Sequence, residues 1–374
     1  MKKILILYSE YGNAHLQVAK YLEEYLNEQY QDEVIVKVLD GFKYANKFWF
    51  NFYKKLYVYN FNIVTTQKRN KLYEKMDHGK ILKNYDKFIS SSFANQKMKK
   101  FINDFNPDVV VSTIHGESHM VGKFRKKGIT NVKALTILTD FEEHSWWLRY
   151  SDYIDYFIVN TKEMALSMSK KGINKNKIKP LGTPIAEKFF NNFDIQTIKE
   201  RYKLPLDKKI ILIFGGGGQG FKESLPYYEE ILKKRTDIVS LFISGKNKKL
   251  EEKARELSKK YNQNTRVFGF VNNVEELMAI SDIIVTKPGG LTIVECLAVK
   301  KPTIYINSIG AQENANLKFV ENKKIGFYCN DVGEFKDKIA LFLNDDNLIK
   351  SYKNHMKKIS KSSSIKEVCK LIME

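Results

Sequence analysis

His15 is the residue near the N-terminus whose type and setting best suit proton transfer. It follows a short apolar run, Ile4–Tyr8, and the loop Ser9–Ala14, and an apolar stripe continues behind it at Val18 and Leu22. This spacing predicts a strand, a loop and a helix that begins close to His15. A histidine at a helix N-terminus can act as a general base, because its ordinary pKa lies near neutrality and the helix dipole disfavours its charged form. A solvent-facing histidine in a capping turn, without a function, is the alternative.

A glycine-rich loop follows another predicted strand, Ile210–Phe214, and begins with Gly215, Gly216 and Gly217. Glycines lack the Cβ atoms that would keep phosphate oxygens away from backbone amides, and a helix start adds positive charge. The spacing also matches the GxGxxG pattern of dinucleotide sites. Those sites need an acidic residue at the end of the next strand, and residues 239–244 lead instead into Gly-Lys-Asn. The loop therefore favours phosphate binding and disfavours NAD.

A third loop separates the apolar strand Ile283–Thr286 from a predicted helix. The sequence Pro-Gly-Gly breaks the strand, and a helix start at this point suits a diphosphate. The carboxylate of Glu295, about one turn into the helix, suits the two hydroxyl groups of a ribose, although a capping interaction is its alternative role. The candidate contacts here are Lys287, Gly289, Gly290, Leu291, Thr292 and Glu295.

A fourth loop, after the strand Thr303–Ile306, is rich in amides. Gln312, Glu313 and Asn316 together offer enough donors and acceptors to hold sugar hydroxyls. The phosphate-suited, ribose-suited and sugar-suited loops all lie in the C-terminal half, whereas His15 lies in the other half. This distribution predicts a nucleotide-sugar donor site in one half and an acceptor site with a base in the other.

Short β-branched runs alternate with helix-length stretches in both halves. Continuous apolar strands separated by helices predict parallel sheets covered on both faces. The predicted strands are 4–8, 34–39, 109–113, 134–139 and 157–160, then 210–214, 239–244, 266–268, 283–286 and 303–306. We expect an α/β protein with two Rossmann-like parallel-sheet domains that face each other across a cleft. The expected boundaries are 1–184 for the acceptor domain, 185–205 for a linker, 206–350 for the donor domain, and 351–374 for a helical segment packing back on the first domain.

The charge balance limits the possible partners. The 374 residues include 63 Lys and Arg against 43 Asp and Glu, a formal net charge of +20, which favours a polyanionic partner. Segment 41–102 alone holds 14 basic and 3 acidic residues, and half of residues 42–61 are aromatic. Rings and lysines together suit an anionic membrane surface. A core of rings under a solvated basic face, and a nucleic-acid surface without any recognised motif, are the alternatives.

Cysteine usage and apolar runs are typical of a cytoplasmic protein. Cys296, Cys329 and Cys369 are widely separated and form no CxxC pair, so neither a disulfide framework nor a zinc site is expected. The apolar run 4–8 is too short for a signal peptide, and no stretch of 18 apolar residues occurs. We therefore expect a protein that is neither secreted nor membrane-spanning.

Taken together, the motifs resemble glycosyltransferase family 28, specifically its processive diacylglycerol β-glucosyltransferases and monogalactosyldiacylglycerol synthases. These enzymes have the GT-B fold of two Rossmann-like domains, and the resemblance covers nearly the whole chain. It is carried by Tyr11–Ala19, by Leu138–Phe141 with His144 and Trp147, by Gly182–Ile185, by Gly269–Val271, by Lys287–Glu295, and by Gln312, Glu313 and Asn316.

The resemblance implies roles for individual residues. His15 corresponds to the base that activates the acceptor, and Glu295 to the residue that holds the uridine ribose. Gln312 and Glu313 correspond to contacts with the donor sugar, and the backbone near Phe270 and Val271 would contact uracil. Asp140 and His144 would position the acceptor or tune His15, or have a structural role only. The family has Gly where this chain has Ala14, which would be strained if the backbone there had a positive φ.

The expected activity is an inverting transfer of a hexose from a UDP-sugar to 1,2-diacylglycerol at the cytoplasmic face of the membrane. Segment 41–102 would bind the anionic surface, and no nucleic acid partner is expected. No DxD-like acidic pair flanks the loops, so we expect neither a metal ion nor another cofactor. The alternatives are a polyprenyl-linked or soluble acceptor, an epimerase of similar fold, and a non-enzymatic basic adaptor for membranes or nucleic acid.

Overall fold

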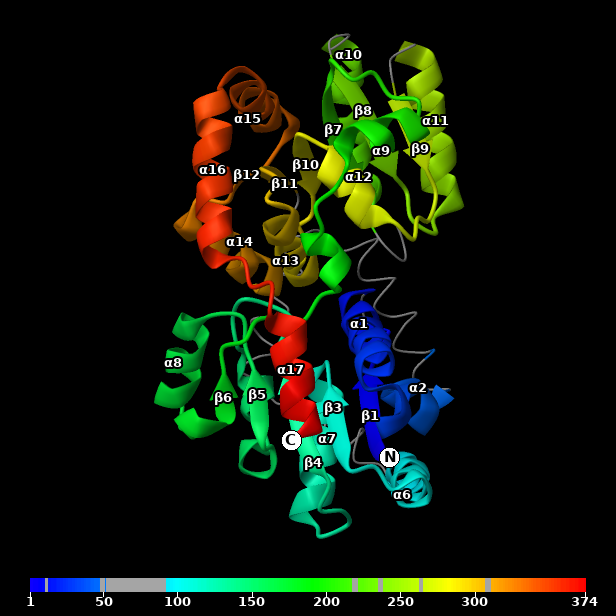
Figure 1. Cartoon of the computed structure of the whole chain (residues 1–374), viewed down its shortest axis with the longest axis vertical. Helices are drawn as coiled ribbons and strands as arrows, with labels where there is room; N and C mark the ends of the chain where they lie inside the picture. Colours follow the sequence, from blue (N-terminus) through cyan, green and yellow to red (C-terminus); the bar gives the residue numbers. More distant parts are fainter. Residues whose placement is uncertain are drawn as a thin grey trace. The chain divides into compact units, whose positions relative to one another are not determined.

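The computed structural model describes residues 1–10, 13–47, 51, 92–216, 221–234, 238–261, 265–306 and 311–374. Its contacts divide the chain into two compact units (Figure 1). The first unit consists of residues 1–186, 309–315 and 363–374, and the second of residues 187–308 and 316–362. The expected C-terminal segment 351–374 is thus divided, because residues up to 362 are grouped with the second unit.

The first unit is built on a six-stranded sheet with the order β2-β1-β3-β4-β5-β6, in which every pair is parallel. Its strands are β1 (Lys2–Tyr8), β2 (Val34–Asp40), β3 (Val109–Ser112), β4 (Lys133–Ile137), β5 (Tyr156–Ile158) and β6 (Ile178–Lys179). Its helices are α1 (Asn13–Tyr30), α2 (Gly41–Ala45), α6 (Ser92–Phe105), α7 (His115–Lys126), α8 (Lys162–Lys170) and α17 (Ser364–Met373), with the short 3₁₀ helices η1 (Gln31–Glu33), η2 (Ser145–Leu148), η3 (Ser151–Tyr153) and η4 (Lys175–Lys177).

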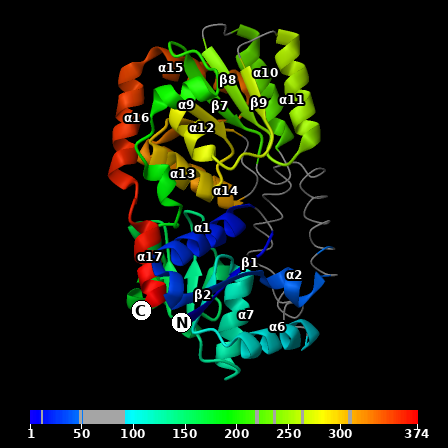
Figure 2. The same cartoon turned by 45° about the vertical axis from the view of Figure 1, so that its right-hand side comes forward.

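Helices cover both faces of this sheet. Leu5 and Leu7 of β1 join a buried cluster that includes Met98 of α6, Phe124 of α7 and Met168 of α8. Helices α1 and α17 contact each other and lie side by side in both views (Figures 1 and 2). Because neighbouring residues of a strand point to opposite faces and helices cover both, residues 4–7 of β1 are all apolar and fully buried.

Side-chain contacts attach α17 to the first unit. The hydroxyl of Ser364 donates to the Gly182 carbonyl at 2.8 Å. Lys2 donates to the carbonyl of Met373, and Lys133 to that of Leu371, both at 2.7 Å. The last ten helical residues of the chain are therefore part of the fold that carries the N-terminal sheet.

The second unit repeats the architecture with a parallel sheet of order β12-β11-β10-β7-β8-β9. Its strands are β7 (Lys209–Phe214), β8 (Ile238–Ile243), β9 (Thr265–Phe268), β10 (Ile283–Thr286), β11 (Thr303–Ile306) and β12 (Gly326–Cys329). Its helices are η5 (Glu187–Phe190), α9 (Ile195–Arg201), η6 (Lys222–Ser224), α10 (Leu225–Lys234), α11 (Lys248–Tyr261), α12 (Val274–Ile280), α13 (Gly290–Val299), α14 (Ala311–Lys323, grouped with the first unit up to Ala315), α15 (Val332–Asn344) and α16 (Asp346–Ile359).

The ten predicted strands are confirmed, and their ends differ from the predicted ones by no more than two residues. Strands β6 and β12 were not predicted. Each is the last strand at one edge of its sheet, and such strands need fewer apolar residues because neighbours cover them on one side only. Among the described residues, no helix combines the length and the apolar character that a membrane crossing requires.

Candidate active site

The first sheet has a switch in strand order beside β1. Strand β2 pairs with one side of β1 and β3 with the other, so the chain leaves the carboxyl ends of β1 and β3 in opposite directions. Open parallel sheets bind ligands in the crevice that forms at such a point. Ser9 and Glu10 follow β1, Thr113 follows β3, and His15 lies in the first turn of α1. The predicted position of His15 at this edge is confirmed by the fold.

The His15 ring is held by the backbone after β3. Its Nδ1 lies 2.6 Å from the carbonyl oxygen of Thr113, and the Thr113 hydroxyl donates to the His15 carbonyl at 3.2 Å. A carbonyl oxygen only accepts hydrogen bonds, so Nδ1 carries the hydrogen and Nε2 carries the lone pair. The half-buried imidazole is thus held in the tautomer that can accept a proton at Nε2.

The surroundings of His15 adjust its proton affinity. Burial lowers the pKa of His15 below its ordinary value, while the carboxylate of Asp140 and the hydrogen bond that the ring donates to the Thr113 carbonyl act in the opposite direction. The lowered pKa keeps the ring neutral at neutral pH, the state required of a base. Ala14 lies in the helical first turn of α1 and is not among the residues with positive φ, so the alanine causes no strain.

The loop that carries Asp140 is fixed by a buried amide. Asn160 donates from Nδ2 to the Asp140 carbonyl at 2.9 Å. Its Oδ1 accepts from the backbone amide of Thr183 at 2.7 Å and from the Thr183 hydroxyl at 2.9 Å. Asn160 was not a candidate in the sequence analysis. The signal that could have indicated it is a polar side chain at the end of an apolar strand, a position where it must find buried partners.

Aromatic rings surround His115 at the same edge of the sheet. The ring centroid of His115 lies 4.9 Å from that of Trp146, 5.4 Å from His144 and 5.6 Å from Trp147. Burial and the neighbouring histidines lower the pKa of His115 well below its ordinary value, and burial lowers that of His119 to about 4. The structure therefore brings the predicted His144 and Trp147 together with His115, His119 and Trp146, which were not predicted. The imidazoles of His115 and His119 are uncharged at neutral pH.

The second sheet has its own switch point, between β7 and β10. Gly215 and Gly216 follow β7, and the loop Lys287–Gly289 follows β10. A Cβ on Gly215 would lie only 2.8 Å from the Leu250 side chain, and Gly216 has a φ of +84°. Both positions therefore require glycine for the backbone to take this path. Gly217, also a candidate, lies outside the described residues.

Helix α13 presents the predicted ribose contact. It begins at Gly290, directly after the turn at Gly289, and its first turn includes the buried Leu291 and the half-buried Thr292. Glu295 lies in the second turn and is 9% exposed. Both phosphate-suited loops and this carboxylate thus lie at the carboxyl edge of neighbouring strands.

Asn316 supports the loop after β10. Its side chain is fully buried and donates from Nδ2 to the carbonyl of Pro288 at 3.0 Å, the contact that the structure gives to this predicted sugar-binding residue. Gln312 and Glu313 lie in the first turn of α14, where Gln312 is exposed and Glu313 half-buried. The amide cluster is therefore divided between Gln312, which is exposed and whose Nε2 lies 3.2 Å from His144 Nε2, and Asn316, which holds a neighbouring loop.

The predicted uracil contacts follow β9. Phe270 is 55% exposed, an unusual degree for a large apolar ring, and Val271 is half-buried. The ammonium group of Lys246, from the loop after β8, lies 5.1 Å from the Phe270 ring centroid. An exposed ring after the carboxyl end of β9 offers a surface on which a flat base can stack.

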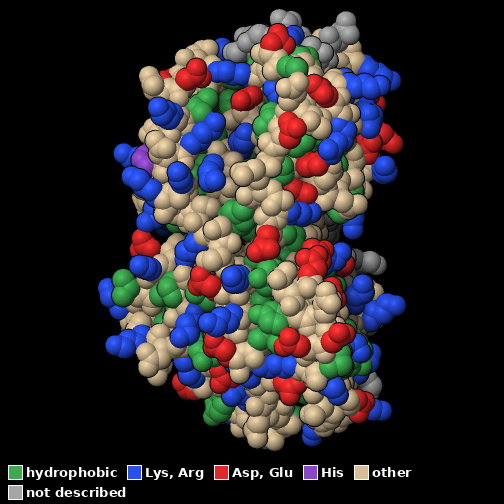
Figure 3. All heavy atoms as spheres, viewed as in Figure 1, with side chains coloured by type: hydrophobic (Ala, Val, Ile, Leu, Met, Phe, Trp, Pro, Cys, Tyr) green, Lys and Arg blue, Asp and Glu red, His purple; other side chains and the backbone are tan. Residues whose placement is uncertain are grey.

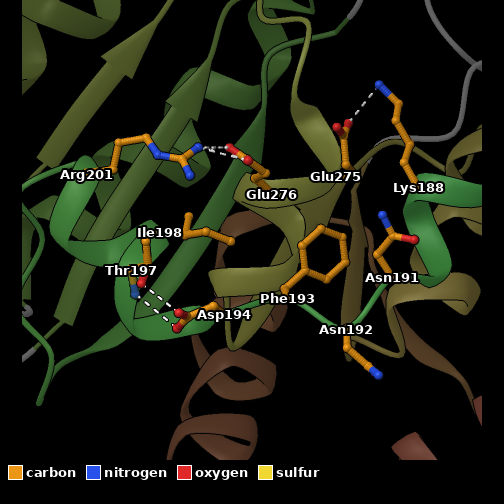
Figure 4. Close-up of a pocket in the computed structure, with 10 residues that line it drawn as sticks. All are labelled: Lys188, Asn191, Asn192, Phe193, Asp194, Thr197, Ile198, Arg201, Glu275 and Glu276. Atoms are coloured by element: carbon orange, nitrogen blue, oxygen red, sulfur yellow. Dashed lines mark hydrogen bonds and ion pairs between the residues drawn. The ribbon is translucent and has the colours of Figure 1, made fainter.

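A pocket of about 270 Å³ elsewhere in the second unit contains none of the predicted residues (Figure 4). Lys188 pairs with Glu275 at 3.2 Å, and Arg201 with Glu276 at 2.9 Å. These pairs join η5 and α9 to α12, so the charges of these four pocket side chains are paired with one another. The pocket is lined by Lys188, Asn191, Asn192, Phe193, Asp194, Thr197, Ile198, Arg201, Glu275 and Glu276.

Comparison with known protein families matches both halves of the chain. Residues 15–185 match monogalactosyldiacylglycerol (MGDG) synthase, and residues 194–361 match glycosyl transferases group 1. A processive diacylglycerol beta-glucosyltransferase from Bacillus cereus (strain B4264) is 30% identical over 96% of this chain and 89% of its own length. The chain belongs to this family of glycosyltransferases. A relative with the same name from Bacillus cytotoxicus is 28% identical over 100% of this chain and 93% of its own length.

Solved structures show the same fold in more distant proteins. MurG of Acinetobacter baumannii has a TM-score of 0.68 with 13% identity, over 100% of this chain and 99% of that one. HepE of Anabaena, in complex with UDP and glucose, has a TM-score of 0.60 with 12% identity over the full length of both chains. Together with the two parallel sheets, these likenesses confirm the predicted GT-B-like fold of two Rossmann-like domains.

Proposed function

We propose that the chain transfers a hexose from a UDP-sugar to the hydroxyl group of 1,2-diacylglycerol, with inversion and without a metal ion or other cofactor. The names of the relatives specify diacylglycerol and β-glucosyl transfer, and a distant structural neighbour holds UDP and glucose. The observation in this chain that best supports the proposal is the hydrogen bond from His15 Nδ1 to Thr113. It leaves Nε2 as a proton acceptor at the switch point of the first sheet.

The reaction we propose is a single displacement. His15 Nε2 takes the proton of the acceptor hydroxyl while the hydroxyl oxygen bonds to the anomeric carbon. The bond from that carbon to the UDP oxygen breaks, and UDP leaves with the electron pair, so the configuration inverts. The negative charge of Asp140 favours the imidazolium that forms. Proton transfer of this kind typically contributes about 10²–10⁴ in rate.

The second unit would bind the donor. Backbone amides of the loop after β7 and of the start of α13 would stabilise the diphosphate as negative charge develops on the leaving group. The side chain of Lys287 would add a positive charge, and Glu295 would accept hydrogen bonds from the ribose. The Phe270–Val271 backbone would contact uracil. Gln312 and Glu313, which are grouped with the first unit, would contact the sugar.

The acceptor would be reached at an anionic membrane surface through segment 41–102. Residues 48–50 and 52–91 of this segment lie outside the described residues. In the described part, Lys97, Lys99 and Lys100 are exposed on α6, while the half-buried Phe101 and Phe105 pack against the core. Lys and Arg side chains are spread over the face seen in Figure 3, interleaved with acidic ones. The formal net charge of +20 attracts the protein to anionic lipid over a long range, and this attraction supports this part of the proposal.

A donor and acceptor screen tests the proposal. Purified protein is incubated with labelled UDP-glucose or UDP-galactose and vesicles that contain diacylglycerol, with and without a metal chelator. We expect a β-linked glycosyl diacylglycerol that forms at the same rate in both conditions. Transfer only to a polyprenyl-linked or soluble acceptor would overturn the acceptor assignment, and a complete loss of activity with chelator would overturn the metal-free mechanism.

A further inference from the structure

A buried glutamate contacts the end of β1, the strand that precedes His15 and its helix. Glu117 is in the first turn of α7, where it is 4% exposed, and its Oε1 forms a hydrogen bond with the hydroxyl of Ser9. Ser9 is the first residue after β1 and is 1% exposed. Since both partners are buried, neither group can exchange this contact for one with bulk water.

The start of the loop is also held by Asp40, at the end of β2. Its Oδ2 accepts a hydrogen bond from the backbone amide of Glu10 at 3.2 Å, and its Oδ1 accepts one from the backbone amide of Lys43 at 2.8 Å. The other end of the loop is held by Thr113, through the His15 ring. Ser9 and Glu10 after β1, and His15 in the first turn of α1, are thus each held by a hydrogen bond to another part of the first unit.

The Glu117 side chain has little room to move. A Cβ atom on Gly41 would lie 2.9 Å from Glu117 Cγ and 3.2 Å from its Oε1, so the carboxyl group packs directly against the backbone of α2. Only glycine at position 41 leaves this space. This packing against Gly41 holds the carboxyl group within hydrogen-bonding distance of Ser9.

We propose that Glu117 is a positioning residue for His15: its buried hydrogen bond with Ser9 fixes the end of β1, the strand that precedes α1 and the base. This inference rests on the proposed role of His15 in the transfer reaction. It assigns to that reaction a residue that makes no contact with substrate, and it makes the placement of the base depend on one buried proton.

The charges around Glu117 explain why the proton matters. Burial and the nearby Asp40 raise the pKa of Glu117 to about 7, although hydrogen bonds from Ser9 and from the amides of Glu117 and Phe42 act in the opposite direction. Burial also raises the pKa of Asp40, which faces Glu10 and Lys43. The Tyr8 hydroxyl, whose pKa is raised by burial and these acids, stays neutral.

Loss of the Glu117 proton has a structural consequence. A second negative charge would then stand beside Asp40 in a buried site, where like charges repel strongly. Because packing against Gly41 leaves the Glu117 side chain little room to move, Asp40 and the Ser9–Glu10 backbone that it holds would shift instead. We therefore expect the placement of His15 to loosen as the pH rises through about 7.

The test compares Glu117→Gln, which keeps the acceptor oxygen and has no charge, with Glu117→Ala, which removes the contact. Glu33→Ala, at an exposed glutamate before β2, is the matched control. Histidine labelled with ¹⁵N reports the tautomer of His15 without substrate, and transfer kinetics from pH 6 to 9 report the rate. For Glu117→Ala we expect a mixed tautomer and a kcat lower by about tenfold to a hundredfold, with KM for the UDP-sugar unchanged. For Glu117→Gln we expect the wild-type tautomer and a smaller decline of kcat above pH 7.

Two results would overturn the inference: an unchanged His15 tautomer and kcat in Glu117→Ala, or an alkaline decline in Glu117→Gln equal to that of the wild type. If Glu117→Ala does not fold, Ser9→Ala removes the same hydrogen bond from the other side and should give the same loss. If the wild type transfers no sugar, the proposed function fails, while the nuclear magnetic resonance readout still decides whether Glu117 positions His15.

Discussion

Replacement of Glu117 by Gln should stabilise the first unit at alkaline pH. The carboxyl group is buried, and its pKa is raised from 4.5 to about 7. An acid with a raised pKa holds its proton more tightly in the folded protein than in the unfolded chain. The free energy of unfolding therefore falls as the pH rises from about 4.5 to 7 and is level above that. The full difference corresponds to about 3 kcal/mol.

Glutamine keeps the oxygen that faces Ser9 but has no proton to lose. At pH 5 most of the wild-type groups are protonated in the folded state, so the variant and the wild type should differ by less than about 1 kcal/mol. At pH 8 the variant should exceed the wild type, and the gain between the two pH values should be about 2–3 kcal/mol. Relaxation of the site around the charged form would reduce this figure.

Urea unfolding followed by tryptophan fluorescence measures the effect. All 3 tryptophans, Trp49, Trp146 and Trp147, fall within residues 1–186, so the signal follows the first unit. Glu33→Gln, at an exposed position, is the control and should show no pH-dependent difference. The reasoning is refuted if Glu117→Gln differs from the wild type by the same amount at pH 5 and pH 8, or is less stable at pH 8.

Three further perturbations test the donor site and the membrane surface. Glu295→Ala should weaken UDP binding by about 1–3 kcal/mol, because it leaves the ribose hydroxyls without their partner; calorimetry showing unchanged affinity would exclude the ribose role. Gly215→Ala should destabilise the second unit by about 1–3 kcal/mol and weaken UDP binding, since a methyl group would lie 2.8 Å from Leu250; a thermal melt at the wild-type temperature would show that the chain accommodates it. The third perturbation replaces four lysines by Gln: Lys43, Lys47, Lys54 and Lys55. It should lower binding to anionic vesicles without changing UDP affinity, and added salt should have the same effect in the wild type. Vesicle sedimentation that does not depend on lipid charge or salt would contradict the membrane role of these lysines.

The strands could be predicted because they are buried on both faces. All four residues of Ile283–Thr286 are buried, and a short run of β-branched residues of this kind is typical of a strand that is covered on both faces. Strand β6, with only Ile178 and Lys179, is too short and too polar to give the same signal. Its pairing with β5 depends on the neighbouring strand rather than on its own residues.

The candidate site could be predicted where the residue type itself carries the chemistry. His15 and Glu295 are titratable groups in the helices that follow β1 and β10, as the sequence predicted. The partner of His15 is a backbone carbonyl, that of Thr113, and a backbone atom has no sequence signature. Asn160 lies far from its partners in sequence, so only the folded chain shows what it holds.

Residues that support loops were harder to separate from residues that face a ligand. Asn316 was grouped with Gln312 and Glu313 because amides suit sugar hydroxyls, yet its side chain is fully buried and holds Pro288. Glu117 gave no signal, since a glutamate in the first turn of a helix usually stabilises the helix dipole. Its contact with Ser9 joins positions 108 residues apart.

The most direct test of the proposed function is sugar transfer by His15→Ala compared with the wild type, on vesicles containing diacylglycerol and with labelled UDP-glucose and UDP-galactose. His355→Ala, at a histidine of α16 in the other unit, is the control and should transfer at the wild-type rate. We expect His15→Ala to lose about 10²–10⁴ in turnover while it binds UDP as tightly as the wild type, because the base acts on the acceptor only. Turnover above about a tenth of the wild-type value would contradict the assignment of His15 as the base.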